Sequence, residues 1–285
     1  MRYALISDIH GNLPALDAVL AGIDQCDDID AIYHLGDLVG YGAWPNEVID
    51  RLTQRGIAGV AGNYDSTVAH GYQHCGCRSE SARQEELARE SFTWTRAAVS
   101  ESGRRWLGGL PFRIDLKPFG GHVAGPTVTL VHATPNSNLV YVTADRTDDF
   151  LLKMAAQAGR SEGDVLCFGH THVPWSRVVG GVTFVNTGSV GRPKDGDARA
   201  GYAVLEMSPG STPVVTFERV AYDVELAARQ VVEAGLPEQF GEFLRRGGRC
   251  DSCMDRDARG RRAIQTVFRE HRSASLTASK PAIPS

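Results

Sequence analysis

Five short polar blocks, each directly behind an apolar run, constrain the fold of this chain more than any other feature. The blocks are Asp8-Ile9-His10, Gly36-Asp37, Gly62-Asn63-Tyr64-Asp65, His132, and Gly169-His170-Thr171-His172. The preceding apolar runs have the length and composition of buried strands. In open α/β sheets, a site forms at the carboxyl ends of the strands. We therefore predict an α/β fold whose strand ends carry one functional site.

The remaining elements are predicted from periodicity and turn residues. Strands are expected at 3–6, 31–35, 57–61, 112–116, 127–131 and 165–168, and helices at 13–23, 46–54 and 147–158. Residues 66–109 should form a helical cap or insertion over the site, with loop residues first and a helix over 79–100. Four later strands should form a second, more antiparallel sheet: 176–179, 182–185, 202–207 and 214–220. A late helix is expected over 223–234, with Asp223 as its N-cap.

Composition limits the class of protein and its domain organisation. The chain has 285 residues and a net charge of -4, which argues against a dedicated nucleic-acid binder. Neither a signal peptide nor an apolar run of about 18 residues is recognisable, so a cytoplasmic protein without a membrane span is expected. We assign 1–246 to one catalytic domain and 247–285 to a basic tail whose last dozen residues are expected to be disordered.

Asp8 and His10 are the first candidate metal ligands. Residues two apart in an extended segment point to the same side, so one carboxylate and one imidazole can reach one ion. The alternative is an N-cap aspartate beside a surface histidine. Asp37 is the natural bridging carboxylate between two ions, since each of its oxygens can bind one ion. Its alternative is a turn aspartate.

The later blocks add amide and imidazole ligands. Asn63 would supply an amide oxygen, although asparagine is also common in left-handed turns. Asp65 would orient a ligand or a substrate group rather than bind an ion. His132 could be a hydrogen-bonded structural residue when taken alone. His170 and His172 are stronger candidates, because they place two imidazoles in one tight turn behind a strand.

Together the candidate ligands exceed what one closed structural ion requires. Their number fits two divalent ions that share a carboxylate, an arrangement suited to in-line displacement at phosphorus. Carboxylate, imidazole and amide oxygen are donors that suit Mn²⁺, Fe²⁺, Zn²⁺ or Ni²⁺. The sequence therefore indicates a dinuclear metal phosphoesterase.

These blocks, together with Asn186-Thr187-Gly188-Ser189-Val190-Gly191, resemble the calcineurin-like metallophosphoesterase superfamily over roughly residues 1–220. The segment 186–191 also resembles the single-domain bacterial and archaeal phosphodiesterase branch of this superfamily. The resemblance implies a four-layer α/β/β/α sandwich with a dinuclear site. It implies that Asp8, His10, Asp37 and His172 hold one ion, and that Asp37, Asn63, His132 and His170 hold the other. A hydroxide held by both ions would then attack phosphorus.

Two positions depart from the pattern of that superfamily. Many members have histidine at the position of Tyr64, where it is thought to assist the leaving group. Tyrosine has a reference pKa of about 10 and is a weaker proton donor than imidazolium. This favours hydrolysis of small phosphodiesters or nucleotides over alkyl monoesters. The second departure is Ala133, where glycine is common, so the loop behind His132 could be reshaped.

Several residues outside the ligand blocks are weaker candidates. Arg192 or Lys194 could bind a substrate phosphate, or both could be surface charges. Cys75 and Cys77, near His70 and His74, are expected to pack or to line the site mouth. A structural zinc there is the alternative, and pairing with Cys250 and Cys253 would make a four-cysteine site.

Other functions remain open at this stage. Within enzymes they are a protein serine/threonine phosphatase, a dinucleoside polyphosphate hydrolase and, less favoured by the net charge, a nuclease. A different class is a non-catalytic protein-binding scaffold on the same fold. Such a scaffold would be free to lose ligands, whereas every ligand position here carries a competent donor. A homo-oligomer is also open.

Overall fold

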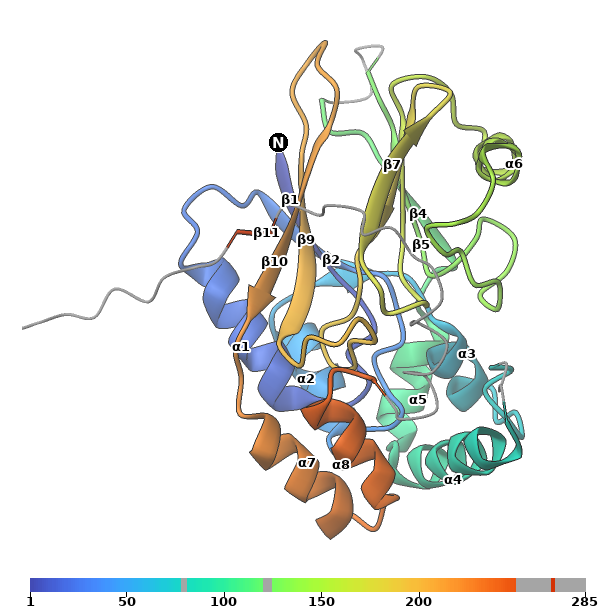
Figure 1. The fold of residues 1–285 in the computed structure, drawn as a ribbon, viewed down its shortest axis with the longest axis vertical. Helices are drawn as coiled ribbons and strands as arrows, with labels where there is room; N and C mark the ends of the chain where they lie inside the picture. Colours follow the sequence, from blue (N-terminus) through green and yellow to red (C-terminus); the bar gives the residue numbers. More distant parts are fainter. Residues whose placement is uncertain (78–80, 120–124, 250–267, 270–285) are drawn as a thin grey trace, which may run out of the picture.

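The computed structural model describes residues 1–77, 81–119, 125–249 and 268–269, and its strands form two sheets (Figure 1). The first sheet has the order β11-β10-β9-β1-β2-β3. Its strands are β1 (Arg2–Ile6), β2 (Ala31–His34), β3 (Ala58–Gly59), β9 (Ala200–Glu206), β10 (Val214–Val220) and β11 (Phe268–Arg269). β1, β2 and β3 run parallel, and β9 lies antiparallel to both β1 and β10.

The second sheet has the order β4-β5-β6-β8-β7. Its strands are β4 (Arg113–Leu116), β5 (Val128–Val131), β6 (Val165–Phe168), β7 (Trp175–Val179) and β8 (Val182–Asn186). β5, β6 and β8 run parallel, while β4 and β7 are antiparallel edge strands. The ligand blocks thus follow strands, as the sequence predicted, and these are parallel strands divided between the two sheets.

The alternation of side chains along β1 separates two hydrophobic cores. Tyr3 and Leu5 belong to the cluster between the two sheets, together with Leu130 and Cys167 of the second sheet. Ala4 and Ile6 face the opposite side, where they pack against helices. Because successive strand residues point to opposite faces, β1 is apolar on both.

Helices cover the outer face of each sheet, which gives four layers. α1 (Leu13–Asp24) and α2 (Pro45–Gln54) pack on the first sheet, and α6 (Asp148–Ala158) packs on the second, at the upper right in Figure 1. Asn12 caps α1 by accepting a hydrogen bond from the Ala15 N–H (3.2 Å). The predicted α/β fold with two sheets flanked by helices is confirmed.

The prediction that the four late strands form one sheet is wrong. β7 and β8 join the second sheet, whereas β9 and β10 join the first, where Leu205 pairs with Tyr3. The first six residues of β9 are all buried, so the strand is apolar on both faces. An all-apolar strand carries no alternation that could identify its neighbours, so pairing was not readable from the sequence.

The described residues between 63 and 109 include three helices: α3 (Asn63–Ala69), α4 (Ala82–Ala98) and α5 (Glu101–Gly108). The loop expected from residue 66 is therefore helix up to Ala69. α3 accommodates Ser66 and Thr67, whose hydroxyls donate to the carbonyls four residues back, at Gly62 and Asn63. One residue of each helix, Val68, Phe92 and Leu107, belongs to the same hydrophobic core as the buried residues of α1 and α2.

The chain continues as a helical pair after β10. α7 (Val224–Glu233) is capped by Asp223, as predicted, whereas α8 (Glu238–Arg245) was not predicted. Cys250, Cys253 and the last dozen residues, expected to be disordered, lie outside the described residues. None of the described helices has the length and apolar character needed to cross a membrane.

Candidate metal centre

The backbone is strained at the ends of the strands that carry the candidate ligands. Six residues other than glycine have positive φ in the described part of the chain: Asp8, His10, Asp37, Tyr41, His170 and His172. All except Tyr41 are candidate ligands. Such conformations cost on the order of 1–3 kcal/mol each, and they persist where the surrounding structure imposes them, commonly at functional sites.

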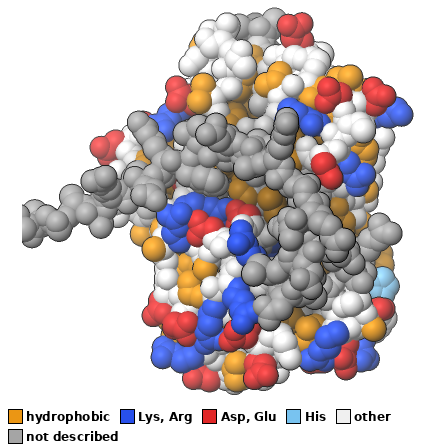
Figure 2. Space-filling model, in the orientation of Figure 1, with side chains coloured by type: hydrophobic (Ala, Val, Ile, Leu, Met, Phe, Trp, Pro, Cys, Tyr) orange, Lys and Arg blue, Asp and Glu red, His pale blue; other side chains and the backbone are white. Residues whose placement is uncertain are grey.

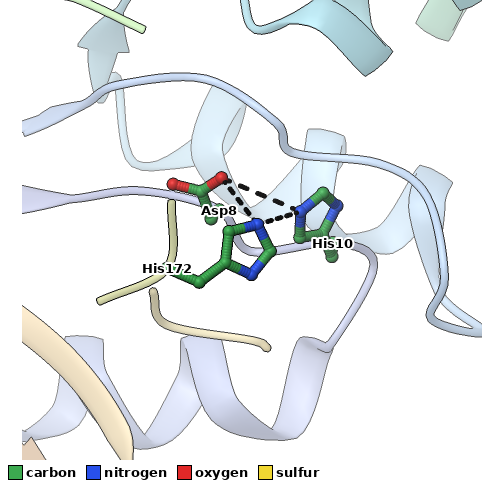
Figure 3. A group of neighbouring side chains, drawn as sticks. All are labelled: Asp8, His10 and His172. Carbon is green, nitrogen blue, oxygen red and sulfur yellow. Dashed lines mark hydrogen bonds and ion pairs between the residues drawn. The ribbon is translucent and has the colours of Figure 1, made fainter. Parts of the chain in front are cut away.

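Asp8, His10 and His172 form the first cluster of buried candidate ligands (Figure 3). His172 Nε2 lies 3.1 Å from Asp8 Oδ1 and 3.2 Å from His10 Nε2. The other carboxylate oxygen, Asp8 Oδ2, accepts hydrogen bonds from Ser7 Oγ (2.6 Å) and the His170 N–H (3.0 Å). Oδ1 is thereby left to face the two imidazoles.

Asp37, His132 and His170 form a second cluster, and Asn63 adjoins it. His132 Nε2 lies 3.1 Å from His170 Nδ1, 3.1 Å from Asn63 Oδ1 and 3.5 Å from Asp37 Oδ2. All four side chains are buried. One carboxylate oxygen, one amide oxygen and two imidazole nitrogens therefore surround this second position.

Asp37 joins the two clusters through a single atom. Its Oδ2 lies 3.8 Å from His10 Nε2 in the first cluster and 3.5 Å from His132 Nε2 in the second. Its Oδ1 accepts a hydrogen bond from the Tyr64 N–H (2.8 Å). Oδ2 thus faces both clusters, whereas Oδ1 is engaged by the backbone.

Backbone carbonyls fix the tautomer of three of the four imidazoles. In each of these the Nδ1–H donates to a carbonyl oxygen: Val39 for His10 (3.0 Å), Leu35 for His132 (2.8 Å) and Arg192 for His172 (2.6 Å). Each Nε2 therefore carries its lone pair toward its cluster.

Burial keeps most of these imidazoles neutral. It lowers the pKa of His10 and His170 well below the usual range, and burial together with the charge of Lys194 lowers the pKa of His172 to about 4. Burial also raises the pKa of Asp37 to about 8, against the opposing effect of His132. A neighbouring cation would favour the charged carboxylate, and neutral imidazoles are the form that binds metals.

Two buried polar atoms of the site lack a hydrogen-bond partner within the described part of the chain. Asp8 Oδ1 and His170 Nε2 are both buried without a hydrogen-bond partner. Leaving a buried polar atom without a partner typically costs about 1–3 kcal/mol. A cation beside Asp8 Oδ1 would remove that cost for the carboxylate, so the first cluster fits a divalent ion.

Asp65 and Tyr64 lie behind the clusters. The Asp65 carboxylate accepts from the Leu38 N–H (2.9 Å) and the Gly62 N–H (2.9 Å), so it ties the Asp37 loop to the Asn63 loop. Tyr64 is fully buried, and its hydroxyl lies 3.3 Å from Ser91 Oγ of α4. The hydroxyl is therefore engaged in the interior on the α4 side.

Cys75 and Cys77 are joined by a disulfide beside Asn63. The Asn63 Nδ2 donates to the Cys75 carbonyl (3.1 Å) and approaches Cys77 Sγ (3.2 Å), which directs the amide oxygen toward His132. The alternative of a zinc site with these thiolates is wrong for this structure, because both sulfur atoms are bonded to each other.

Arg192 and Lys194 lie on the His172 side of the centre. The Arg192 guanidinium carbon lies 4.0 Å from the Tyr41 ring centroid and 4.4 Å from that of Phe243 in α8. Arg192 is 9% exposed, and its guanidinium has no carboxylate partner within the described residues. A buried cation held by aromatic rings next to His10 is suited to receive an anion.

Some residues that shape the site were not singled out by their chemistry. Ser189 Oγ donates to the Asp8 carbonyl (2.7 Å), and the Asn186 side chain donates to the Gly169 carbonyl (2.8 Å). They explain why the Asn186–Gly191 segment accompanies the ligand blocks. Ser91 and Tyr141 also reach the site region, and no sequence pattern marked either of them.

Comparison with known proteins places this geometry in a family. Residues 1–210 match the calcineurin-like phosphoesterase superfamily domain. The chain is similar to the uncharacterised protein MJ0912 of Methanocaldococcus jannaschii, with 30% identity over 258 residues that cover 85% of this chain and 96% of that protein.

Solved structures agree with this match. A metallophosphoesterase from Sphaerobacter thermophilus shares 30% identity and a TM-score of 0.65, over 87% of this chain and 99% of that chain. The hypothetical protein PH1004 from Pyrococcus horikoshii OT3 shares the fold, with 21% identity, a TM-score of 0.72, and coverage of 87% and 99%.

The fold and the paired clusters define a metal-dependent hydrolase, with two candidate ion positions that meet at one carboxylate oxygen. The chain belongs to the calcineurin-like phosphoesterase superfamily, and it is a hydrolase that acts on phosphoric ester bonds.

Proposed function

We propose that this chain is a phosphodiesterase that hydrolyses small phosphodiesters or nucleotides with two divalent ions. The first ion would be held by Asp8, His10, Asp37 and His172, and the second by Asp37, Asn63, His132 and His170. The observation that carries the proposal is the position of Asp37 Oδ2, which faces imidazoles of both clusters. A single oxygen so placed can serve two ions at once.

The donor set narrows the choice of metal without fixing it. Neutral imidazoles, carboxylates and one amide oxygen suit Mn²⁺, Fe²⁺, Zn²⁺ or Ni²⁺, and cellular availability usually decides among them. When bound, two such ions supply an activated water at neutral pH and neutralise charge on the phosphoryl oxygens.

The residues of the chain hold and orient the reactants. Arg192 would bind a substrate phosphoryl oxygen, since its buried guanidinium has no carboxylate partner among the described residues and lies beside His10. Lys194 adds positive charge beside His172. Asn63 would supply its amide oxygen to the second ion, and Asp65 holds the loops of Asp37 and Asn63 together through its hydrogen bonds.

The choice of diesters over alkyl monoesters rests on Tyr64. Burial raises its pKa well above the usual value, so its hydroxyl stays protonated, and Ser91 engages it at 3.3 Å. The chain therefore offers no strong proton donor at this position. Aryl, ribose or cyclic phosphodiester leaving groups depend less on such a donor than alkyl monoesters do.

Two alternatives, a non-catalytic scaffold and a nuclease, receive less support. A non-catalytic scaffold would not need seven competent buried donors: Asp8, His10, Asp37, Asn63, His132, His170 and His172. On the face of the molecule in Figure 2, Lys and Arg side chains are interspersed with Asp and Glu. The described side chains visible on that face therefore form a surface of mixed charge, which does not favour a nucleic acid.

The test is hydrolysis of bis(p-nitrophenyl) phosphate and p-nitrophenyl phosphate by metal-stripped protein before and after addition of Mn²⁺. We expect Mn²⁺-dependent cleavage with preference for the diester. Asp37→Ala should abolish it, whereas Asp50→Ala, on the exposed face of α2, should leave it intact. Preference for the monoester, or activity that survives Asp37→Ala, would contradict the proposal.

A further inference from the structure

His170 differs from the other imidazoles of the centre in how it is held. Its Nδ1 lies 3.1 Å from His132 Nε2, so Nδ1 is the nitrogen that faces the second cluster. Its Nε2 is buried without a hydrogen-bond partner, whereas the outward nitrogens of the other three imidazoles each bond a backbone carbonyl. Among the described residues, no backbone carbonyl holds the outer edge of this ring, and the rings of Tyr141 and His132 lie against it instead.

The nearer of these two rings is that of Tyr141, since the His132 and His170 ring centroids are 4.9 Å apart. The Tyr141 and His170 ring centroids are 4.3 Å apart, and the ring planes are inclined by 33°. This is a close, tilted stack of the two rings, and aromatic pairs are typically worth about 0.5–1.5 kcal/mol beyond area burial. Tyr141 is half-buried, so it covers His170 from the solvent side.

The loop that carries Tyr141 is itself held rigidly. The Tyr141 carbonyl accepts two hydrogen bonds from the Arg146 guanidinium, from Nε (3.1 Å) and Nη2 (2.7 Å). The next carbonyl, that of Val142, accepts from Trp175 Nε1 (3.2 Å). Trp175 begins β7, three residues after His172. The Tyr141 ring is thus fixed relative to the Gly169–His172 turn.

We propose that Tyr141 is a positioning residue that holds the His170 imidazole in its ion-binding orientation by stacking. This inference rests on the proposed second ion site. The stack does for His170 what a carbonyl acceptor does for the other three imidazoles. It requires the aromatic ring of Tyr141 and not its hydroxyl, and it bears on only one of the two ions.

The test is calorimetric titration of metal-free protein with Mn²⁺, which resolves the two binding steps. Tyr141→Ala should weaken one step by roughly 3- to 10-fold, the equivalent of the stack. The other step should stay unchanged. Tyr141→Phe should bind like the wild type, and Tyr72→Ala, which removes an exposed tyrosine, serves as the control. Tyr141→Leu, which keeps most of the bulk, replaces Tyr141→Ala if that variant does not fold.

The outcomes separate the two proposals. A wild-type protein that does not bind two ions overturns the proposed function before the variants are compared. If the wild type binds two ions and Tyr141→Ala and Tyr141→Leu bind both as tightly, the positioning role is wrong. It is equally wrong if Tyr141→Phe loses affinity, because the hydroxyl would then carry the effect, or if both steps weaken together.

Discussion

Leaving-group dependence is the kinetic property that Tyr64 should control. Its ring is fully buried, its hydroxyl faces Ser91, and its pKa is raised well above the usual value by burial. With no donor for the departing oxygen, the rate should fall steeply as the leaving group becomes more basic. A well-placed general acid typically contributes about 10²–10⁴-fold. Tyr64→His should therefore raise turnover of poor leaving groups by about 100-fold relative to that of p-nitrophenyl esters.

The assay measures kcat/KM across a series of phosphodiesters of substituted phenols, with Mn²⁺ saturating. The wild type and Tyr64→Phe should share one steep slope against leaving-group pKa, and Tyr64→His should give a shallower one. The histidine variant should lose about 1–3 kcal/mol of stability, since it removes part of a buried ring, so rates are compared below its unfolding temperature. A specific loss by Tyr64→Phe on poor leaving groups would refute the reasoning, because tyrosine would then be the donor.

Three further predictions concern single residues. His34 is buried with neither ring nitrogen hydrogen-bonded, and burial lowers its pKa to about 3 from 6.5. As the pH falls below about 6.5, the unfolded state takes up this proton and the folded state does not, so the free energy of unfolding falls toward pH 3, by up to about 5 kcal/mol. In chemical denaturation of the metal-free protein, His34→Leu should show a shallower decline. A Cβ at Gly62 would lie 2.1 Å from Asp37 Oδ1, so Gly62→Ala should weaken Mn²⁺ binding by more than about 10-fold. Gly22→Ala is the control and should leave Mn²⁺ binding unchanged, because a Cβ there would meet no atom nearer than 3.6 Å. Arg192→Gln should reduce kcat/KM by roughly 10- to 100-fold with Mn²⁺ affinity retained, and equal loss of both would contradict a role in phosphate binding.

The candidate site was predictable because its chemistry is concentrated in short strand-end blocks. Asp8, Asp37 and His132 each follow an apolar run, and the sheets bring those run ends to one place. What the blocks could not convey is atomic orientation. Only Asp37 Oδ2 faces both clusters, because Oδ1 accepts the Tyr64 N–H. This depends on α3 beginning at Asn63, whereas the sequence predicted a loop from residue 66.

Contacts between segments far apart in the sequence could not be predicted, for a different reason. Tyr141 lies in an irregular loop with no periodicity, and its position depends on Arg146 and Trp175. Likewise β9 is apolar on both faces, so only tertiary packing assigns it to β1. Local patterns thus identified the strands and ligands, whereas pairing and support came from the assembled core.

The most direct test of the two-ion site joined by Asp37 is a titration of metal-free protein with Mn²⁺, followed by electron paramagnetic resonance and by diester hydrolysis on the same samples. The account predicts two ions per chain, an exchange-coupled spectrum, and a rate that rises with the second ion. Asp37→Ala should lose both the coupling and the rate. Full activity at one ion per chain, or two ions without coupling, would contradict the account.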